Sequence, residues 1–239
     1  SSCLTILGII YAGHIALPLN LVAGSKIIAY TLDHSETALI FTANDCEKLI
    51  SEALSDFKKE VEIIKLDSQL GPIWGKEAPN ETFVKKENVS AEEIAVIMYT
   101  SGTTGNPKGV MLSHSNLLAA GRYISSGHEV DHKDTALCVL PIYHINGLCV
   151  TVMGTLASAS TLVLPDRFSV NAFWTIIETH RCTWFSAVPT QYSYILNNKS
   201  MPGKIPFLRF ARSASAPLSP EIHRKFEERF KIPIIETMG

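Results

Sequence analysis

The sequence predicts an α/β fold of layered, mostly parallel β-sheets flanked by helices. Short apolar runs that stop at Pro, Ser or Gly alternate along the chain with amphipathic segments. This alternation implies parallel strands that are joined by right-handed crossovers. Apolar residues make up 46% of the 239 residues and charged residues 18%, which is a globular composition in a chain long enough for a large core.

The first part of the chain alternates between helix and strand up to residue 66. Helices are predicted at residues 3–11, 25–34 and 45–59, and Ser25 is the expected cap of the second. Strands are predicted at residues 15–19, 38–42 and 61–66. Residues 71–90 combine Gly and Pro with a run of charges, so they are expected to form a variable linker.

The alternation resumes after the linker. Strands are predicted at residues 94–99, 135–140, 160–164, 182–188, 207–213 and 232–236, and helices at residues 115–126, 146–158, 169–180, 190–197 and 219–230. The chain is therefore expected to contain a first α/β subdomain at residues 1–70, the linker at 71–90, and a second α/β subdomain at 91–239. Ligands of open α/β sheets bind at the carboxyl ends of the strands, so the residues that follow each strand are the candidates for a site.

Composition excludes several classes of function. The net charge is −2 and no basic stripe occurs, so a nucleic-acid partner is not expected. The five cysteines show no C-x-x-C spacing and three lie in apolar runs, which favours reduced, buried thiols in a cytoplasmic protein. Pro141, His144 and Asn146 interrupt the most apolar region, residues 136–164, so a transmembrane span is not expected, although peripheral contact with a membrane stays open.

Both ends of the chain look cut. The sequence begins with Ser1 inside an apolar pattern, and it stops directly after the apolar run at residues 232–235. No secretory signal is recognisable. The chain is therefore expected to be a piece of a longer protein whose oligomeric state the sequence does not reveal.

The most informative stretch is residues 99–110, which read Y-T-S-G-T-T-G-N-P-K-G-V. Hydroxyls, glycine backbone N–H groups and one lysine in a turn form an array that suits a polyphosphate. A flexible surface loop is the alternative. The string is not the G-x-x-x-x-G-K-[ST] phosphate loop, because Gly109 follows Lys108. The candidate nucleotide-binding residues are Thr100, Ser101, Gly102, Thr103, Thr104, Gly105, Pro107 and Lys108.

Two further motifs follow predicted strands. The first is P-I-Y-H-I-N-G at residues 141–147, whose His144 is a candidate catalytic residue, with an ordinary capped or core histidine as the alternative. The second is R-S-A-S-A-P-L-S-P-E at residues 212–221, where small residues let a flat ring lie against the backbone. Part of that block is structural, since Ser219 and Pro220 are typical of a helix start.

These strings resemble the characteristic motifs of the adenylate-forming superfamily, which comprises acyl- and aryl-CoA synthetases, luciferases and the adenylation domains of peptide synthetases. The resemblance covers essentially the whole chain and implies the large N-terminal domain of that fold, in part. It implies that residues 100–108 hold the β- and γ-phosphates of ATP with Mg²⁺, that Thr100 is a Mg²⁺ ligand and Lys108 a catalytic residue, and that His144 lies beside the carboxylate and the α-phosphate.

The resemblance also assigns roles near the end of the chain. It implies that Ala214, Ser215, Ala216 and Pro217 form one wall of the adenine site, with Ala214 in place of the usual glycine. Glu236, Thr237, Met238 and Gly239 begin the next nucleotide-binding block, in which Met238 replaces a stacking aromatic residue. Residues 188–190 border the carboxylate pocket, or simply end a strand. The aromatic residues Trp184, Phe185, Tyr192 and Tyr194 suit the core as well as the pocket wall.

The resemblance implies an AMP-forming acyl-CoA synthetase. Such an enzyme activates a carboxylic acid, here expected to be a fatty or aryl acid, with ATP and transfers the acyl group from acyl-AMP to coenzyme A. The chain alone is expected to be inactive, because the glutamate that holds Mg²⁺ and the catalytic lysine of the small domain lie beyond its end. The alternatives are an acyl-AMP ligase that feeds a carrier protein, a luciferase-like enzyme, and a nucleotide-binding relative without activity.

Overall fold

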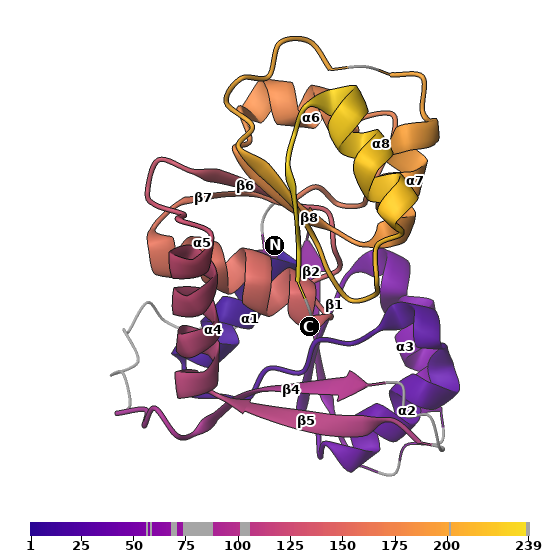
Figure 1. Cartoon of the computed structure of the whole chain (residues 1–239). Helices are drawn as coiled ribbons and strands as arrows, with labels where there is room; N and C mark the ends of the chain where they lie inside the picture. The colour runs from indigo at the N-terminus through magenta and orange to yellow at the C-terminus, as the bar shows by residue number, and fades with distance from the viewer. Residues whose placement is uncertain are drawn as a thin grey trace. The chain divides into compact units, whose positions relative to one another are not determined.

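A computed structural model describes residues 1–55, 57, 59–67, 71–73, 88–100, 106–200 and 202–237. The chain forms two compact units, Ser1–His114 and Ser115–Gly239 (Figure 1). Ser101, Gly102, Thr103, Thr104, Gly105, Met238 and Gly239, which carry predictions, lie outside the described residues.

The first unit contains two small sheets and three α-helices. The helices are α1 (Ser2–Tyr11), α2 (Ser25–His34) and α3 (Glu47–Leu54), with short 3₁₀ turns η1 (Leu21–Ala23) and η2 (Asn44–Cys46). In one sheet β1 (Leu39–Thr42) pairs in parallel with β2 (Glu62–Asp67), and β3 (Gly71–Ile73) pairs antiparallel with β2. The apolar faces of α2, α3 and β1 meet in a core of Ile28, Leu32, Ile40, Ile50 and Ala53.

Several local predictions for this unit need correction. The helix predicted at residues 45–59 ends at Leu54. Gly24 is the N-cap of α2 and Ser25 is the first residue inside the helix. In place of the strand predicted at residues 15–19 the structure has a single bridge between Ala16 and Val96. Only the backbone of Ala16 bonds to the second sheet of the unit at that point.

The second sheet of the first unit is a hairpin that the sequence did not predict. Strand β4 (Ile94–Thr100) pairs antiparallel with β5 (Lys108–Ser113). The prediction placed a loop between residue 99 and the helix at 115, because Gly and Pro dominate its start. Strand β5 has only β4 as a neighbour, and Lys108, Val110 and Met111 are exposed, so it is an edge strand that stays partly in solvent.

The division between the units falls later than the linker that the sequence predicts at residues 71–90. Ala16 donates its N–H to the carbonyl of Ala95 at 2.9 Å and accepts from the N–H of Ile97 at 3.0 Å. These bonds fasten β4 to the first unit, and β5 follows because it pairs with β4. Residues 91–114 therefore belong with the first unit in the structure, whereas the sequence assigns them to the second.

The second unit is built on a five-stranded sheet in the order β10-β9-β8-β6-β7, and every neighbouring pair is parallel. This sheet confirms the predicted α/β class. Its strands, all close to their predicted positions, are β6 (Thr135–Cys138), β7 (Thr161–Val163), β8 (Trp184–Ala187), β9 (Phe210–Ser213) and β10 (Ile234–Glu236).

Helices cover both faces of this sheet. The α-helices are α4 (His114–Gly127), α5 (Met153–Ser158), α6 (Phe173–His180), α7 (Pro189–Asn197) and α8 (Pro220–Phe230), and the π-helix η3 (Asn146–Val152) leads directly into α5. The prediction of one helix at residues 146–158 is right in position, but its first part has π geometry. Ser219 occupies the N-cap of α8, as expected, with Pro220 next to it.

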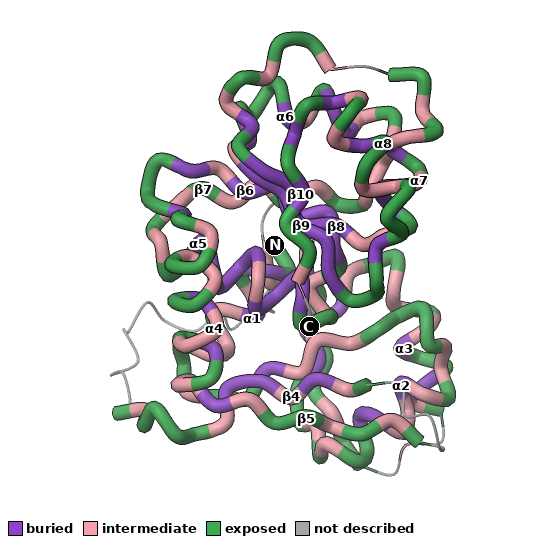
Figure 2. Tube along the Cα trace, in the orientation of Figure 1, coloured by how far each residue is buried: buried purple, intermediate pink, exposed green. Residues whose placement is uncertain are grey.

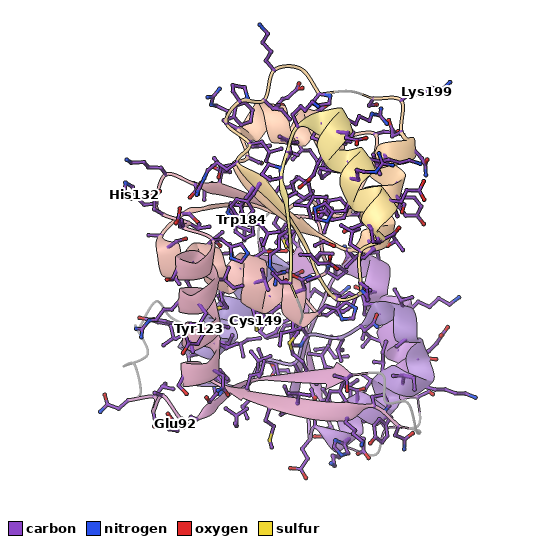
Figure 3. All side chains as sticks on the ribbon, in the orientation of Figure 1. Glu92, Tyr123, His132, Cys149, Trp184 and Lys199 are labelled. Carbon is purple, nitrogen blue, oxygen red and sulfur yellow. The ribbon has the colours of Figure 1, made fainter. Side chains whose placement is uncertain are left out.

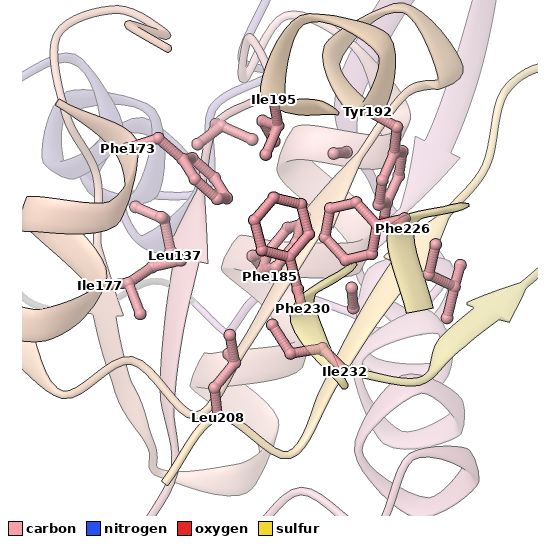
Figure 4. Packing of buried hydrophobic residues seen from close by; sticks show 14 of the residues in the cluster. Leu137, Phe173, Ile177, Phe185, Tyr192, Ile195, Leu208, Phe226, Phe230 and Ile232 are labelled. Atoms are coloured by element: carbon pink, nitrogen blue, oxygen red, sulfur yellow. The ribbon is translucent and has the colours of Figure 1, made fainter. Parts of the chain in front are cut away.

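Alternating residues of the strands fill two cores (Figure 2). On one face Phe185 and Ala211 pack with Phe173, Tyr192 and Phe226 of α6, α7 and α8, as Figure 4 shows. On the other face Ala136, Trp184 and Phe210 pack with residues of α4 and η3. Since neighbouring residues of a strand point to opposite faces, Trp184 and Phe185 serve different cores. The second unit is therefore a three-layer sandwich with a buried sheet.

The cysteine prediction is confirmed in its structural part: all five thiols are free, and Cys3, Cys138, Cys149 and Cys182 are buried. Burial raises the pKa of Cys149 to about 11 and that of Cys182 to about 12, so these thiols stay protonated at neutral pH. None of the helices in the described ranges has the length and apolar character that a membrane crossing requires.

Candidate functional site

The hairpin of the first unit presents the described ends of the glycine-rich stretch. Thr100, the last residue of β4, is the pairing partner of Lys108, the first residue of β5. Directly opposed residues of an antiparallel pair project to the same face, so the hydroxyl and the ammonium leave the hairpin on one side. Both residues are exposed and Pro107 is half-buried. Thr100 and Lys108 thus hold the two ends of residues 101–107 at a fixed separation.

The base of the hairpin depends on a close contact at Gly109. A Cβ at this position would lie 3.2 Å from Cζ of Tyr99 and 3.1 Å from Cγ2 of Ile97, so the glycine makes room for the Tyr99 ring. The Tyr99 hydroxyl and Nδ1 of His34 lie 2.7 Å apart, and burial raises the pKa of Tyr99. The glycine after Lys108 therefore has a packing reason that is independent of any ligand.

The second unit contains a cavity of about 480 Å³ at the carboxyl ends of its central strands. Its polar lining residues are His144, Asn146, Thr190, Gln191, Tyr194 and Ser215. Its apolar lining residues are Leu140, Pro141, Ile145, Phe168 and Val188. They come from the segments that follow β6, β7, β8 and β9, because parallel strands end at the same edge of the sheet. The volume matches that of small-molecule sites.

The spacing of the P-x-x-H-x-x-G motif follows from how the chain turns after β6. The N–H of His144 donates to the carbonyl of Pro141 at 3.1 Å, which closes a turn. Gly147 then packs against this turn, and a Cβ there would lie 2.3 Å from the Pro141 carbonyl oxygen. The glycine permits the contact, and His144 is left exposed at the cavity with its ring 4.7 Å from that of Tyr143.

Behind the cavity wall lies a buried polar network. Oδ1 of Asn146 accepts from Nη1 of Arg212 at 3.0 Å and from the hydroxyl of Ser186 at 3.1 Å. Nδ2 of Asn146 donates to Oγ of Ser215 at 3.2 Å. Because two donors meet Oδ1, the orientation of the Asn146 amide is determined by the network.

Arg212 is the least expected member of this network. Its side chain projects from β9, and the residue is only 4% exposed. Burial lowers the pKa of Arg212, with a smaller opposing effect from Tyr192, yet guanidinium groups start so far above neutrality that the charge remains. No carboxylate forms an ion pair with it within the described ranges. Its Nε also has no hydrogen-bond partner there.

The segment after β9 consists of small residues, of which Ser215 lines the cavity. Ala214 is buried with no positive φ, so replacing the family's glycine by alanine causes no backbone strain here. Ser215, by contrast, has φ of 74° and is exposed. Such a backbone conformation is uncommon for a residue other than glycine and persists where the surroundings enforce it. Ala216 and Pro217 are exposed beyond it.

Strand β10 supports this segment from the side. Oε1 of Glu236 accepts from the N–H of Leu218 at 2.8 Å, and the N–H of Thr237 donates to the carbonyl of Ser213 at 2.9 Å. Within the described residues Glu236 and Thr237 thus position the Ser213–Leu218 segment, and their contact with a nucleotide stays a prediction.

The structure separates the aromatic candidates. Trp184, Phe185 and Tyr192 are 0% exposed and belong to the two cores. Tyr194 lines the cavity. Sequence reasoning missed Asn146, Gln191 and Arg212 as members of the site region. The sequence contained one signal for Arg212. A charged residue in an otherwise apolar strand is costly to bury unless it is paired or hydrogen-bonded.

The magnesium prediction finds limited support in the donor set. Within the residues that the structure describes, no group of three or more His, Cys, Asp or Glu side chains could hold a metal ion. The exposed hydroxyl of Thr100 fits at most one position of an ion that is held mainly by nucleotide phosphates. Thr100 as a Mg²⁺ ligand stays a prediction.

A parallel α/β sheet with a cavity at the carboxyl ends of its strands is typical of ligand-binding α/β domains. The chain belongs to the AMP-binding enzyme family, whose model matches residues 2–239. This membership confirms the resemblance to adenylate-forming enzymes.

The chain is similar to two curated relatives over nearly its whole length. It is 41% identical to a sulfoacetate–CoA ligase of Cupriavidus necator over 98% of this chain and 46% of the relative. It is 32% identical to an oxalate–CoA ligase of Arabidopsis thaliana over 97% of this chain and 46% of the relative. The chain thus spans about half the length of the curated relatives that it matches.

Solved structures share the fold. The ATP-bound MatB of Rhodopseudomonas palustris superposes with a TM-score of 0.81 at 24% identity, over 100% of this chain and 47% of that one. The O-succinylbenzoate coenzyme A synthetase of Bacillus subtilis, in complex with ATP and magnesium ion, gives a TM-score of 0.83 at 25% identity, also over 100% of this chain and 47% of that one. These likenesses confirm the predicted fold class.

Proposed function

We propose that the protein in its full natural length is an AMP-forming acid–thiol ligase. It activates a carboxylic acid with ATP to acyl-AMP and pyrophosphate, and then transfers the acyl group to coenzyme A. The observation that carries the proposal is the similarity of nearly the whole chain to named CoA ligases at up to 41% identity. The free thiols support a cytoplasmic location as part of the same proposal.

Each described site residue has a part in this reaction. The Lys108 ammonium neutralises negative charge on the leaving pyrophosphate, and Thr100 donates a hydroxyl beside it. Magnesium supplies further counter-charge to the phosphates when bound. His144, exposed at the cavity, donates a hydrogen bond to the acid, and the segment at residues 214–217 forms a wall against the adenine. The residues position the reactants in line, since the carboxylate itself is the nucleophile.

The acid is the least determined part of the proposal. The sequence predicts a fatty or aryl acid, whereas the relatives act, by their names, on sulfoacetate and oxalate, which are short and doubly acidic. The lining supports an acid without an ammonium group, because no Asp or Glu is among the residues that line the cavity. His144 offers such a group no negative partner either.

The test is an acid-dependent assay on the full-length protein with ATP, Mg²⁺ and coenzyme A. The expected products are AMP and an acyl-CoA thioester, both quantified by chromatography, and acid-dependent exchange of labelled pyrophosphate into ATP. A reaction that needs a carrier protein in place of coenzyme A would identify an acyl-AMP ligase, and light emission a luciferase-like enzyme. Thermal stabilisation by ATP without any product would identify a nucleotide-binding relative without activity.

A further inference from the structure

The buried guanidinium of Arg212 needs a physical explanation. A charge that is taken out of water is stable in a protein when it is paired, and pairing normally means a carboxylate. Arg212 is 4% exposed, and within the described ranges its hydrogen bonds go to two neutral groups, Asn146 Oδ1 at 3.0 Å and Ser186 Oγ at 3.3 Å. The net charge of this network is therefore +1.

The hydrogen bonds of the network lead, from donor to acceptor, from Arg212 to the cavity. Arg212 donates to Asn146 Oδ1, and Asn146 Nδ2 then donates to Ser215 Oγ at 3.2 Å. The Ser215 hydroxyl accepts this bond and still has its own proton to donate. Ser215 lines the cavity, where its backbone has φ of 74°. A chain of donors that begins at a cation is polarised along its length, so the terminal hydroxyl is a stronger donor than an isolated serine.

Among the residues that the structure describes, none that lines the cavity carries a negative charge to complement this polarity. Asn146 and Ser215 line the cavity beside His144. A singly charged acid uses its only carboxylate as the nucleophile that attacks ATP. A second anionic group on the acid would complement the positive charge of the Arg212 network.

We infer that the relay from Arg212 through Asn146 to Ser215 makes this cavity selective for short acids with a second negative group, such as a sulfonate or a second carboxylate. The hydroxyl of Ser215 contacts that group, while the backbone of residues 214–217 is the part that the proposed function sets against the adenine. Arg212 is a positioning residue that acts through Asn146. This inference rests on the proposed function and names its substrate class, and it replaces the fatty or aryl acid that the sequence predicts.

The test compares acids that differ only in the second charge, with the full-length protein. Sulfoacetate is paired with methylsulfonylacetate, which keeps the sulfonyl group but lacks the second charge, and malonate is paired with its monomethyl ester. The readout is the ratio of kcat/KM values within each pair, from acyl-CoA formation. The wild-type ratio is expected to favour the doubly charged acid by about 100-fold, the scale of two charge-assisted hydrogen bonds.

Three variants separate selectivity from folding. Arg212→Gln and Ser215→Ala are expected to lower the ratio about tenfold each, mainly through KM for the doubly charged acid. Arg212→Lys keeps the charge and is expected to retain most of the preference. Ser126→Ala, an exposed serine of α4, is the matched control and should leave the ratio unchanged. Because Ser215 is exposed, its variant remains informative if the Arg212 variants do not fold.

Two results would overturn the inference. One is a wild-type protein that uses both acids of each pair equally. The other is a pair of variants, Arg212→Gln and Ser215→Ala, that reduce activity with both acids by the same factor, which is what a purely structural role predicts. Absence of thioester with every acid would instead contradict the proposed function. Calorimetric binding of sulfoacetate then decides the inference by itself: weaker binding to Ser215→Ala than to Ser126→Ala supports it, and equal or no binding contradicts it.

Discussion

The hairpin of the first unit and the cavity of the second unit differ in how they hold their polar side chains. Under the proposed function, each presents polar groups to a charged ligand. In the hairpin, the polar residues Thr100 and Lys108 are exposed at the paired ends of the two strands. The cavity presents side chains that rise from a buried five-stranded sheet and are held by a network behind the wall.

The side chains of the second unit are drawn in Figure 3, where Trp184 lies on the sheet and Cys149 on η3. Both residues are at most 5% exposed, so the structure around the sheet of this unit is closely packed. The comparison teaches that changes in the hairpin should alter chemistry with little effect on folding, whereas changes around the cavity should alter both.

The largest expected effect concerns Lys108→Ala in the full-length protein. Loss of the ammonium is expected to lower acid-dependent pyrophosphate exchange about 10²–10³-fold, as removal of one preorganised donor does elsewhere. The melting temperature should stay the same, because the side chain is exposed. Lys26→Ala, another exposed lysine of the first unit, is the control. Exchange at the wild-type rate would remove Lys108 from the phosphate site.

The next effect concerns folding of the second unit. Gly147→Ala places a Cβ 2.3 Å from the backbone carbonyl oxygen of Pro141, which cannot move without opening the turn that carries His144. We expect a loss of about 3 kcal/mol in the free energy of unfolding, measured with urea. Gly127→Ala is the matched control, since a Cβ at this position, at the end of α4, would meet no neighbouring atom within 4 Å. Equal stability of both variants would contradict this packing.

An acid-sensitive ion pair exists in the second unit. Burial raises the pKa of Asp134, but hydrogen bonds from Arg209 at 2.6 Å, from Thr183 at 2.6 Å and from the N–H of Asp131 outweigh burial, so the pKa lies below its ordinary value. A lowered pKa in the folded state adds stability above the unfolded value of about 3.9, and this stability is lost as the pH falls through the folded pKa.

Asp134→Asn is therefore expected to cost about 1–2 kcal/mol at pH 7 and to flatten the loss of stability below about pH 4. Asp33→Asn in the first unit is the contrasting control. Its partner Lys59 lies 3.6 Å away and both side chains are more than half exposed, so the expected change is close to zero. Urea unfolding between pH 3 and pH 7 measures both. An unchanged pH profile for Asp134→Asn would contradict the assigned ion pair.

The smallest effect is expected for Gly109→Ala. Its Cβ would lie 3.1 Å from Ile97 and 3.2 Å from Tyr99, but these are side-chain atoms that can shift by a few tenths of an ångström. The expected loss is about 0.5–1 kcal/mol, measured by the same urea titration. A loss as large as that of Gly147→Ala would show that the hairpin is as tightly constrained as the turn before η3.

The sequence by itself determined the α/β class, the order of helices and strands in the second unit, the positions of the motifs and the family. These properties depend on residues that are neighbours in the chain: apolar periodicity, Pro and Gly at element ends, and the string from Thr100 to Lys108. Local sequence failed where a partner strand decides the structure. Strand β5 begins within a Gly- and Pro-rich stretch and exists because β4 offers it a full set of backbone bonds.

The tertiary structure alone decided which side chains meet. Arg212 and Asn146 are 66 positions apart, and only the parallel order of β6, β8 and β9 brings them together beside Ser186. It likewise put Tyr192 into the core and Tyr194 at the cavity, although both lie on one helix with similar composition around them. The physical reason is that local preferences act over a few residues, whereas the charge that a cavity presents depends on which distant strands end beside it.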